Sequence, residues 1–390
     1  MEEIRIGICG LGGRGLKWLR LLDRIDGYRV TAICDRIEAL HERALSVLAE
    51  PGQVRTYSRY EDLLADDDVD AIGLTVRCAR QGAMAAEALE AGKHISSEVP
   101  AAHTIEDCWR IVLAAERGDR VYHLAEQTRF WGFVDAWADL VRSGRLGRVT
   151  YCEGQYLGYY VMGQYFQDPK SGRFFSIPEL ASHPEAEPTY LHTMPSIHYL
   201  PHELSPMLKV LDDRVVEVTA MGTASPSYAH PEIHQPDIQV ALMKTEKDAV
   251  LRMLTGFTQP VPQRDHHWWQ IIATRGCVEW RRSDRDMPKM WLADEQMHGA
   301  AEVDWRPQRT DAPPEARGSG HGDSDYYTHA AFRDALLDGK DTGFDVYHAI
   351  ETAAPAILAA DSIDQGSQPL RVPDFRPGPD RPAGQAPKEA

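Results

Sequence analysis

Near the N-terminus, a short apolar run leads into Gly10-Leu11-Gly12-Gly13-Arg14-Gly15, a G-x-G-x-x-G pattern. In such a pattern the first glycine permits a tight turn, the second lets the backbone approach a pyrophosphate, and the third lets the following helix pack closely. The free N–H groups at the start of that helix bind phosphates. Asp35 follows Gly15 by twenty residues. Its carboxylate would accept hydrogen bonds from ribose hydroxyls and repel a 2′-phosphate, which predicts a dinucleotide site that favours NAD over NADP.

Other residues are expected to complete this site. Arg36 adjoins Asp35 and could weaken the preference for NAD. The alternative reading is a glycine-rich turn in some other doubly wound protein. The cofactor-binding residues that we expect are Gly10, Leu11, Gly12, Gly13, Arg14, Gly15, Asp35, Arg36, Thr75, Glu98 and Val99.

Alternating apolar runs and helical patterns surround these residues up to about residue 125. The expected strands begin with 4–9, 28–34 and 69–76, and the expected helices include 37–50, 81–92 and 105–118. This repetition predicts a doubly wound parallel sheet, a Rossmann domain over residues 1–125.

Strand patterns of another kind follow after about residue 146. Alternating or aromatic-rich segments at 147–160, 214–222, 237–257 and 266–283 predict an open, mostly antiparallel sheet, with a hairpin turn at 245–248. We assign residues 126–375 to a substrate and oligomerisation domain whose late helix, near 345–362, packs back on the Rossmann domain. The Pro-rich tail 376–390 is expected to be a surface strap or disordered. The run His266-His267-Trp268-Trp269 is expected to line a sheet core or a subunit interface.

Composition limits the possible partners and the compartment. The 390 residues carry a formal charge of −17, which argues against nucleic acid or anionic membrane as the main partner. The first ten residues lack the pattern of a secretory signal, and no apolar run is long enough to span a membrane. Six scattered cysteines without a C-x-x-C pair predict reduced thiols in the cytoplasm and no zinc framework. Between His198 and His202, Pro201 argues against a zinc-binding helix, so we expect no metal.

Together with the phosphate loop and the open second sheet, Glu98-Val99-Pro100 resembles the Gfo/Idh/MocA oxidoreductases over residues 4–375. Most dehydrogenases of that family read E-K-P, where the lysine helps to move a substrate hydroxyl proton. Val99 in that place, followed by Asp107-Cys108-Trp109, is similar to the NAD-dependent glycosidase branch, glycoside hydrolase family 109. The segments 320–326 (GHGDSDY) and 372–375 (VPDF) are similar to further motifs of that family.

The resemblance implies a glycosidase in which NAD is recycled. The sugar would be oxidised at C3, a base would remove the acidified C2 proton, the aglycone would be eliminated, water would add, and the C3 ketone would be reduced again. One alternative is a pyranoside C3 dehydrogenase that releases NADH. Another is a non-catalytic sugar sensor. Exposed sheet faces in this family usually pair, which implies a homo-oligomer, a dimer or a tetramer.

The same resemblance implies roles for individual residues. Tyr156, in Gly154-Gln155-Tyr156, is the candidate C2 base, although it could simply pack within its strand. Its phenol would need a nearby cation or the charge of NAD⁺ to lower its pKa. His202 is a candidate hydroxyl ligand or proton shuttle. Glu98, the third candidate catalytic residue, would hold the nicotinamide ribose or position a loop. The expected substrate-binding residues are Glu126, Tyr199, His202 and Tyr326.

Overall fold

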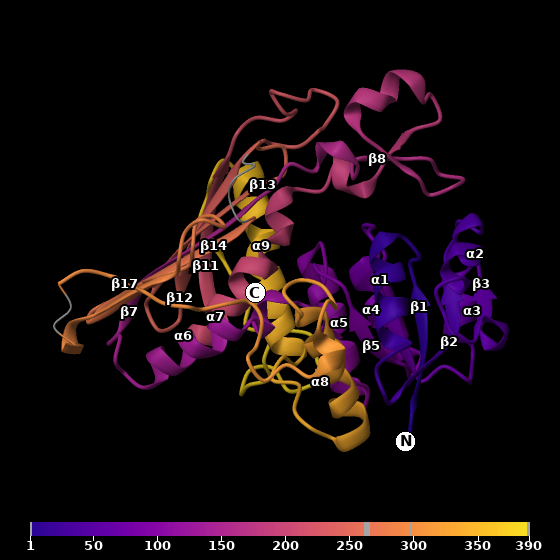
Figure 1. The fold of residues 1–390 in the computed structure, drawn as a ribbon, viewed down its shortest axis with the longest axis horizontal. Coiled ribbons are helices and arrows are strands. Elements are labelled where there is room, and N and C mark those ends of the chain that lie inside the picture. The colour runs from indigo at the N-terminus through magenta and orange to yellow at the C-terminus, as the bar shows by residue number, and fades with distance from the viewer. Residues whose placement is uncertain (1, 261–265, 296–297, 388–390) are drawn as a thin grey trace.

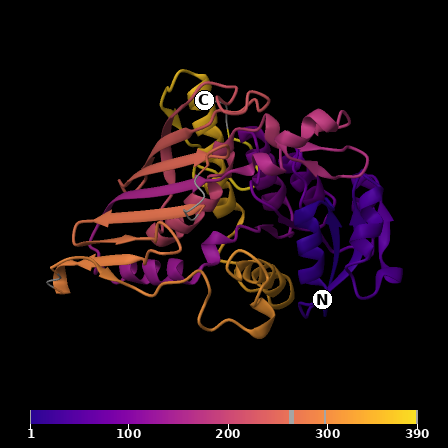
Figure 2. The same ribbon diagram turned by 45° about the horizontal axis from the view of Figure 1, so that its top comes forward.

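The computed structural model describes residues 2–260, 266–295 and 298–387. Two large β-sheets lie at opposite ends of the molecule, and helix α9 (Val346–Asp364) runs between them (Figure 1). A view turned by 45° shows the same arrangement (Figure 2). Within the described ranges, no helix is long and apolar enough to cross a membrane.

The N-terminal sheet has six parallel strands in the order β3-β2-β1-β4-β5-β6, which confirms the doubly wound prediction. The strand order changes direction between β1 and β4, and in such sheets the ligand crevice opens at that point. The strands are β1 (Ile4–Cys9), β2 (Tyr28–Cys34), β3 (Arg55–Tyr57), β4 (Ala71–Leu74), β5 (His94–Ser97) and β6 (Tyr122–Leu124). The helices are α1 (Gly13–Leu22), α2 (Ala39–Leu45), α3 (Tyr60–Leu64), α4 (Gln81–Glu90) and α5 (Ile105–Arg117).

Helix α2 is shorter than the helix predicted over 37–50. The backbone N–H of Ala49, which would lie within the predicted helix, donates instead to the carboxylate of Asp23 at 2.9 Å. The carboxylate of Asp23, 26 residues earlier in the chain, thus takes the place of the helical carbonyl as the acceptor for Ala49.

The C-terminal sheet has nine strands in the order β17-β16-β15-β14-β7-β13-β12-β11-β18. Only the β7–β13 pair among them is parallel, so the mostly antiparallel prediction is confirmed. The hairpin predicted at 245–248 joins β12 to β13. The strands are β7 (Val149–Leu157), β11 (Val215–Gly222), β12 (Gln239–Thr245), β13 (Val250–Gly256), β14 (His267–Ala273), β15 (Gly276–Glu279), β16 (Lys289–Leu292), β17 (Ala301–Glu302) and β18 (Leu370–Arg371).

Three helices pack on one face of this sheet: α6 (Gly132–Arg142), α7 (Pro201–Leu211) and α9 (Figure 1). Helix α9 has small and aliphatic residues on two sides. Ala356 and Ala359 join the core under the nine-stranded sheet, whereas Ile350 and Ala353 join the core around α4 and α5. Helix α9 therefore packs against both the nine-stranded sheet and the helices of the Rossmann domain. Helix α8 (Ser324–Asp338) lies beside β1, and the Tyr28 hydroxyl donates to the His329 carbonyl at 2.7 Å.

An arm, residues 160–199, extends from the end of β7 toward the Rossmann sheet (Figures 1 and 2). It contains a small antiparallel sheet of β8 (Phe166–Gln167), β9 (Phe174–Phe175) and β10 (Glu187–Pro188). The Arg77 guanidinium, in the β4–α4 loop, donates to the Gln164 side chain at 3.2 Å. The arm therefore connects the two sheets on the side where the cofactor crevice opens.

The Pro-rich tail forms a surface strap as far as residue 387. Arg381 is buried, and its guanidinium pairs with Glu116 of α5 at 2.8 Å. The Gly384 N–H donates to the same carboxylate at 2.6 Å. The tail is thereby fixed along α5, which agrees with the strap alternative of the sequence prediction.

Candidate active site

The phosphate loop follows β1 at the switch point of the parallel sheet. Gly10 has a positive φ of 97°, and its N–H donates to the Cys34 carbonyl at 2.9 Å. A Cβ on Gly15 would lie 1.9 Å from the Gly10 oxygen, so this position excludes any larger residue. The Thr75 hydroxyl donates to the same oxygen at 2.6 Å and joins the end of β4 to the loop. Gly10 therefore forms the tight turn after β1, and Gly15 allows the close approach of α1 to the loop.

The middle of the loop has room for a ligand. A Cβ on Gly12 or Gly13 would meet no atom within 4 Å, and no acidic residue stands in the first turn of α1. Unobstructed backbone N–H groups at the start of a helix form an anion site. These features fit the pyrophosphate of a dinucleotide.

Asp35 is half-buried at the end of β2 and is fixed by backbone donors. One carboxylate oxygen accepts from the Leu11 N–H at 2.7 Å, and the other accepts from the Ile37 N–H at 2.9 Å. Each oxygen keeps a further acceptor position. The carboxylate is therefore held beside the phosphate loop with capacity for two ribose hydroxyls. Arg36 is exposed next to it.

Arg14 joins the phosphate loop to two distant carboxylates. Its Nε donates to Glu98 at 2.5 Å, and its two terminal nitrogens donate to Asp325 at 2.7 and 2.9 Å. Burial disfavours the charge on Arg14, but the two carboxylates outweigh it and raise its pKa. Burial likewise opposes ionisation of Glu98 and Asp325, yet Arg14 and other hydrogen-bond donors keep both pKa values below their ordinary range. This ionised cluster fixes α1, β5 and α8 relative to one another.

Glu98 and Val99 occupy the position of the E-x-P motif. The Gln127 side chain donates to Glu98 at 3.1 Å, and the Val99–Pro100 peptide bond is cis. Val99 is buried. Arg14 thus places a guanidinium against Glu98, while residue 99 itself contributes no charge.

A second cluster surrounds Tyr156 near the end of β7. Its hydroxyl lies 2.9 Å from the Tyr160 hydroxyl, and its ring contacts those of Tyr199, His202 and His267 at centroid distances of 6.5, 5.5 and 4.2 Å. Burial, followed by Tyr160 and nearby acidic groups, raises the pKa of Tyr156 well above its ordinary value. The predicted residues Tyr156, Tyr199 and His202 therefore lie together, with the phenol neutral in the unliganded protein.

Glu126 holds His202. The imidazole Nδ1 lies 2.7 Å from Oε1 of Glu126, and that carboxylate also accepts bonds from Thr128 and the Arg129 N–H. Glu126 is completely buried. Glu126 was predicted to bind substrate; in the structure its carboxylate bonds to His202 and orients the imidazole. The adjacent Gln127 bonds to Glu98, so this dipeptide connects the Tyr156 cluster to the cofactor loop.

Tyr326 lies apart from the Tyr156 cluster. Its backbone N–H donates to Ser319, its ring contacts Tyr327, and it packs against the core that contains α1 and β1. The neighbouring residue, Asp325, points to Arg14. The structure therefore brings the motif at 320–326 to the phosphate loop through Asp325 and gives Tyr326 no described contact with Tyr156.

Sequence reasoning missed a further pair in the site, Glu203 and His267. They lie 2.6 Å apart, next to Tyr156. Trp268 and Trp269 are buried in the sheet core, as expected for that run, but His267 is directed toward the Tyr156 cluster. Successive side chains of a strand point to opposite faces of the sheet. This alternation within 266–269 could have predicted that His267 and Trp268 lie on different faces.

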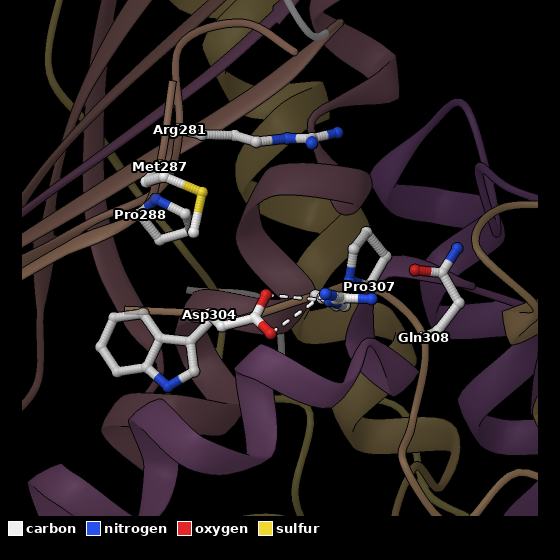
Figure 3. Close-up of a pocket in the computed structure, with 8 residues that line it drawn as sticks. Arg281, Met287, Pro288, Asp304, Pro307 and Gln308 are labelled. Carbon is white, nitrogen blue, oxygen red and sulfur yellow. Dashed lines mark hydrogen bonds and ion pairs between the residues drawn. The ribbon is translucent and has the colours of Figure 1, made fainter. Parts of the chain in front are cut away.

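A cavity of about 340 Å³ lies elsewhere on the C-terminal sheet (Figure 3). Its lining combines Trp305, Met287 and two prolines with the Asp304–Arg306 ion pair. It contains none of the predicted site residues, so we do not assign it to the reaction.

Two segments of the chain match models of known protein families. Residues 4–126 match the model of the oxidoreductase family with an NAD-binding Rossmann fold (GFO_IDH_MocA). Residues 218–379 match the model of the glycosyl hydrolase 109 C-terminal domain. A glycosyl hydrolase family 109 protein of Shewanella sp. (strain W3-18-1) is 27% identical, over 97% of this chain and 86% of the relative. A second one, from Phocaeicola vulgatus, is 26% identical over 96% of this chain and 95% of its own length.

Solved structures of low sequence identity share the fold. An oxidoreductase domain protein from Kribbella flavida superposes with a TM-score of 0.74 at 17% identity, covering 96% of this chain and 100% of that one. The scyllo-inositol dehydrogenase of Lactobacillus casei, solved with NAD(H) and scyllo-inositol, has a TM-score of 0.67 at 18% identity, covering 95% and 99%.

These matches and the fit of the phosphate loop establish NAD as the cofactor and the protein as an enzyme. The chain matches the NAD-binding Rossmann domain of the Gfo/Idh/MocA oxidoreductases over residues 4–126 and the C-terminal domain of glycosyl hydrolase family 109 over residues 218–379, the two families that its motifs resemble.

Proposed function

We propose that the protein is an NAD-dependent glycoside hydrolase that acts by transient oxidation of its sugar substrate. The observation that carries this proposal is the link made by residues 126 and 127. Glu126 binds His202 beside Tyr156, and Gln127 binds Glu98 beside the phosphate loop. A sugar bound against Tyr156 and His202 would therefore lie next to the nicotinamide end of the cofactor site.

His202 is positioned to take the C3 hydroxyl proton. With Nδ1–H donated to the Glu126 carboxylate, the neutral imidazole has its lone pair on Nε2. This acceptor fits a hydroxyl that must lose its proton as C3 is oxidised. When bound beside Glu98, the nicotinamide would supply the redox chemistry: it would hold the hydride taken from C3 and return that hydride to C3 after water has added. Glu126 acts as a positioning residue that fixes the tautomer.

Tyr156 would remove the C2 proton after oxidation, because a ketone at C3 acidifies that position. Expulsion of the aglycone from C1 completes the elimination, and water then adds to C1. Tyr160 is bonded to the Tyr156 hydroxyl and is half-exposed, which offers the phenolic proton a path to solvent. The valine at position 99 is consistent with this mechanism, because His202 and Tyr156 carry out both proton transfers and no lysine is needed at residue 99.

One assay separates this function from its alternatives. The protein would be stripped of cofactor and given NAD⁺ far below the concentration of each member of a nitrophenyl glycoside panel, including anionic sugars. Nitrophenol release and absorbance at the NADH band would be recorded together. Many nitrophenol turnovers per NAD⁺ without accumulating NADH are expected. NADH rising with oxidised sugar, without aglycone release, would instead identify a pyranoside dehydrogenase. Sugar binding without either signal would identify a sensor.

Substitution of Tyr156 tests the site itself. Tyr156→Phe should abolish nitrophenol release but leave NAD⁺ affinity unchanged, because the phenol is required only for the C2 step. Tyr228→Phe is the matched control, since Tyr228 is 73% exposed. Equal activity of Tyr156→Phe and the wild type would exclude Tyr156 as the base.

We also propose that the protein is a cytoplasmic homo-oligomer that pairs through the open face of the nine-stranded sheet. Apolar side chains are exposed on the strands of this sheet, including Leu242, Val250 and Ile272, and all six cysteines are free. Leu242→Lys should shift the mass measured by light scattering toward the monomer. An unchanged mass would refute this interface.

A further inference from the structure

The Glu203–His267 pair is a buried proton-binding unit beside Tyr156. The imidazole Nδ1 is 2.6 Å from Oε1 of Glu203. Glu203 is completely buried, and its Oε2 has no hydrogen-bond partner among the described residues. The His267 ring lies 4.2 Å from the Tyr156 ring, with the two planes at 35°.

Strand pairing fixes this arrangement. His267 of β14 is the register partner of Tyr156 on β7, so the two rings lie side by side on one face of the sheet. Trp269 lies parallel to His267 at 5.7 Å. A Cβ on Gly154 would lie 2.9 Å from the Cβ of Glu203, so the absence of a side chain there leaves room for the carboxyl group. The register of β14 against β7 and the space at Gly154 therefore hold Glu203 and His267 in contact in the folded protein.

Burial and charge indicate how many protons the pair holds. Burial, together with the Glu126 charge, raises the pKa of Glu203 well above its ordinary value. Burial, together with neighbouring histidines, lowers the pKa of His267 well below its ordinary value. Both shifts favour a Glu203 carboxyl with a neutral His267 imidazole at rest. Transfer of the proton along the same hydrogen bond gives a carboxylate with an imidazolium, and the pair has no net charge in either form. Both forms carry a hydrogen on Nε2 of His267.

We propose that Glu203 and His267 are positioning residues that prepare Tyr156 to accept the C2 proton. When Tyr156 ionises, the carboxyl proton of Glu203 moves to Nδ1 of His267, which leaves a carboxylate and places an imidazolium beside the phenolate. The imidazolium stabilises the phenolate of Tyr156, whose proton passes to Tyr160 and then to water. The C2 proton later restores the phenol. This inference rests on the proposed glycosidase function, because that reaction requires a base at C2.

An imidazolium at His267 should lower the pKa of Tyr156 enough to change its phenolate fraction measurably. An opposite charge within about 4–6 Å lowers the pKa of an acid by roughly 1–3 units, and because the Glu203 carboxylate offsets part of the imidazolium's effect, the lower value applies to Tyr156. One unit changes the phenolate fraction about tenfold. The other titratable or charged groups around Tyr156 and His267 come from six segments and are Arg77, Glu126, Tyr160, Tyr199, His202, His266 and His321.

The test uses the NAD-loaded full-length protein with Glu203→Gln, which keeps the size of the side chain but cannot transfer its proton. Glu203→Asp retains a carboxyl and serves as the conservative variant. Glu185→Gln is the matched control, because Glu185 forms a 2.8 Å pair with His183 on the arm. Glu185 lies outside the site described above.

Two measurements need no substrate. In spectra of ¹⁵N-histidine protein, the signal of the proton shared between Glu203 and Nδ1 of His267, identified by its loss in His267→Gln, should disappear in Glu203→Gln and persist in Glu185→Gln. Ultraviolet titration of the Tyr156 phenolate, taken as the difference from the matching Tyr156→Phe protein, should shift upward by about one pH unit or more in Glu203→Gln. An unchanged phenolate titration would overturn the proposal, even if the spectrum changes.

Turnover provides the third measurement. Glu203→Gln should lower kcat at least about tenfold with little change in KM, and Glu203→Asp should recover part of kcat. A wild-type kcat in Glu203→Gln would overturn the proposal. If the wild type releases no aglycone from any glycoside, the proposed function fails, but the phenolate titration still decides whether the pair acts on Tyr156.

Discussion

Arg14 should stabilise the fold as well as the cofactor site, and Arg14→Met tests this. The substitution preserves much of the apolar stem but leaves Glu98 and Asp325 without their guanidinium partner. The three side chains are only 18%, 15% and 2% exposed, so solvent cannot fully replace the lost bonds. Removing one member of a buried ion pair costs about 3–5 kcal/mol. Because His321 still bonds to Asp325 at 2.9 Å, we expect the lower value, about 3 kcal/mol.

The loss in free energy of unfolding caused by Arg14→Met should be larger at neutral pH than at acidic pH. In the wild type, the pKa values of Glu98 and Asp325 are lowered, so their contribution is present above the unfolded values near about 4 and is lost as pH falls through the folded values. Without Arg14, burial raises both pKa values, so the variant buries charge most unfavourably at neutral pH. Its deficit should therefore be larger at pH 7.5 than at pH 5.

Urea unfolding followed by circular dichroism at the two pH values measures this deficit. Lys17→Met is the matched control, since Lys17 is exposed on the same helix. A deficit below about 1 kcal/mol at pH 7.5, the usual value of a surface ion pair, would refute the reasoning. Equal deficits at both pH values would refute the assignment of the cause to Glu98 and Asp325.

Three further substitutions test the cofactor site and the tail. Gly15→Ala should abolish NAD⁺ binding, measured by fluorescence titration, because its Cβ would lie 1.9 Å from a backbone oxygen of the phosphate loop. Asp35→Ala should weaken NAD⁺ binding and narrow its advantage over NADP⁺, because the ribose acceptor and the charge that repels a 2′-phosphate are both lost; an unchanged ratio of dissociation constants would contradict this role. Arg381→Ala should destabilise the protein by about 3 kcal/mol, because it leaves Glu116, whose side chain is 3% exposed, without its guanidinium partner. If the tail does not stabilise the fold, urea unfolding will give the same free energy of unfolding for Arg381→Ala and the wild type.

Local sequence patterns were sufficient to predict those features that depend on residues close together in the chain. The spacing of three glycines and Asp35 identified the cofactor loop, since backbone conformation and strand ends are set within about thirty residues. The turn at 245–248 and the alternation of strands and helices were predicted for the same reason. The motif resemblance placed Tyr156, Tyr199 and His202 in one site, and the structure brings them together.

Long-range partners required the tertiary structure. Arg14 is separated by 84 residues from Glu98 and by 311 from Asp325, and Glu203 by 64 from His267. Their contacts depend on how α1, β5 and α8, or α7 and β14, pack together. Burial then decides which groups are ionised. The sequence by itself determined the cofactor, the two sheets and the family of reaction, because glycine spacing, strand periodicity and motifs are local. Only the tertiary structure decided which side chains share protons, because that depends on distances between segments far apart in the chain.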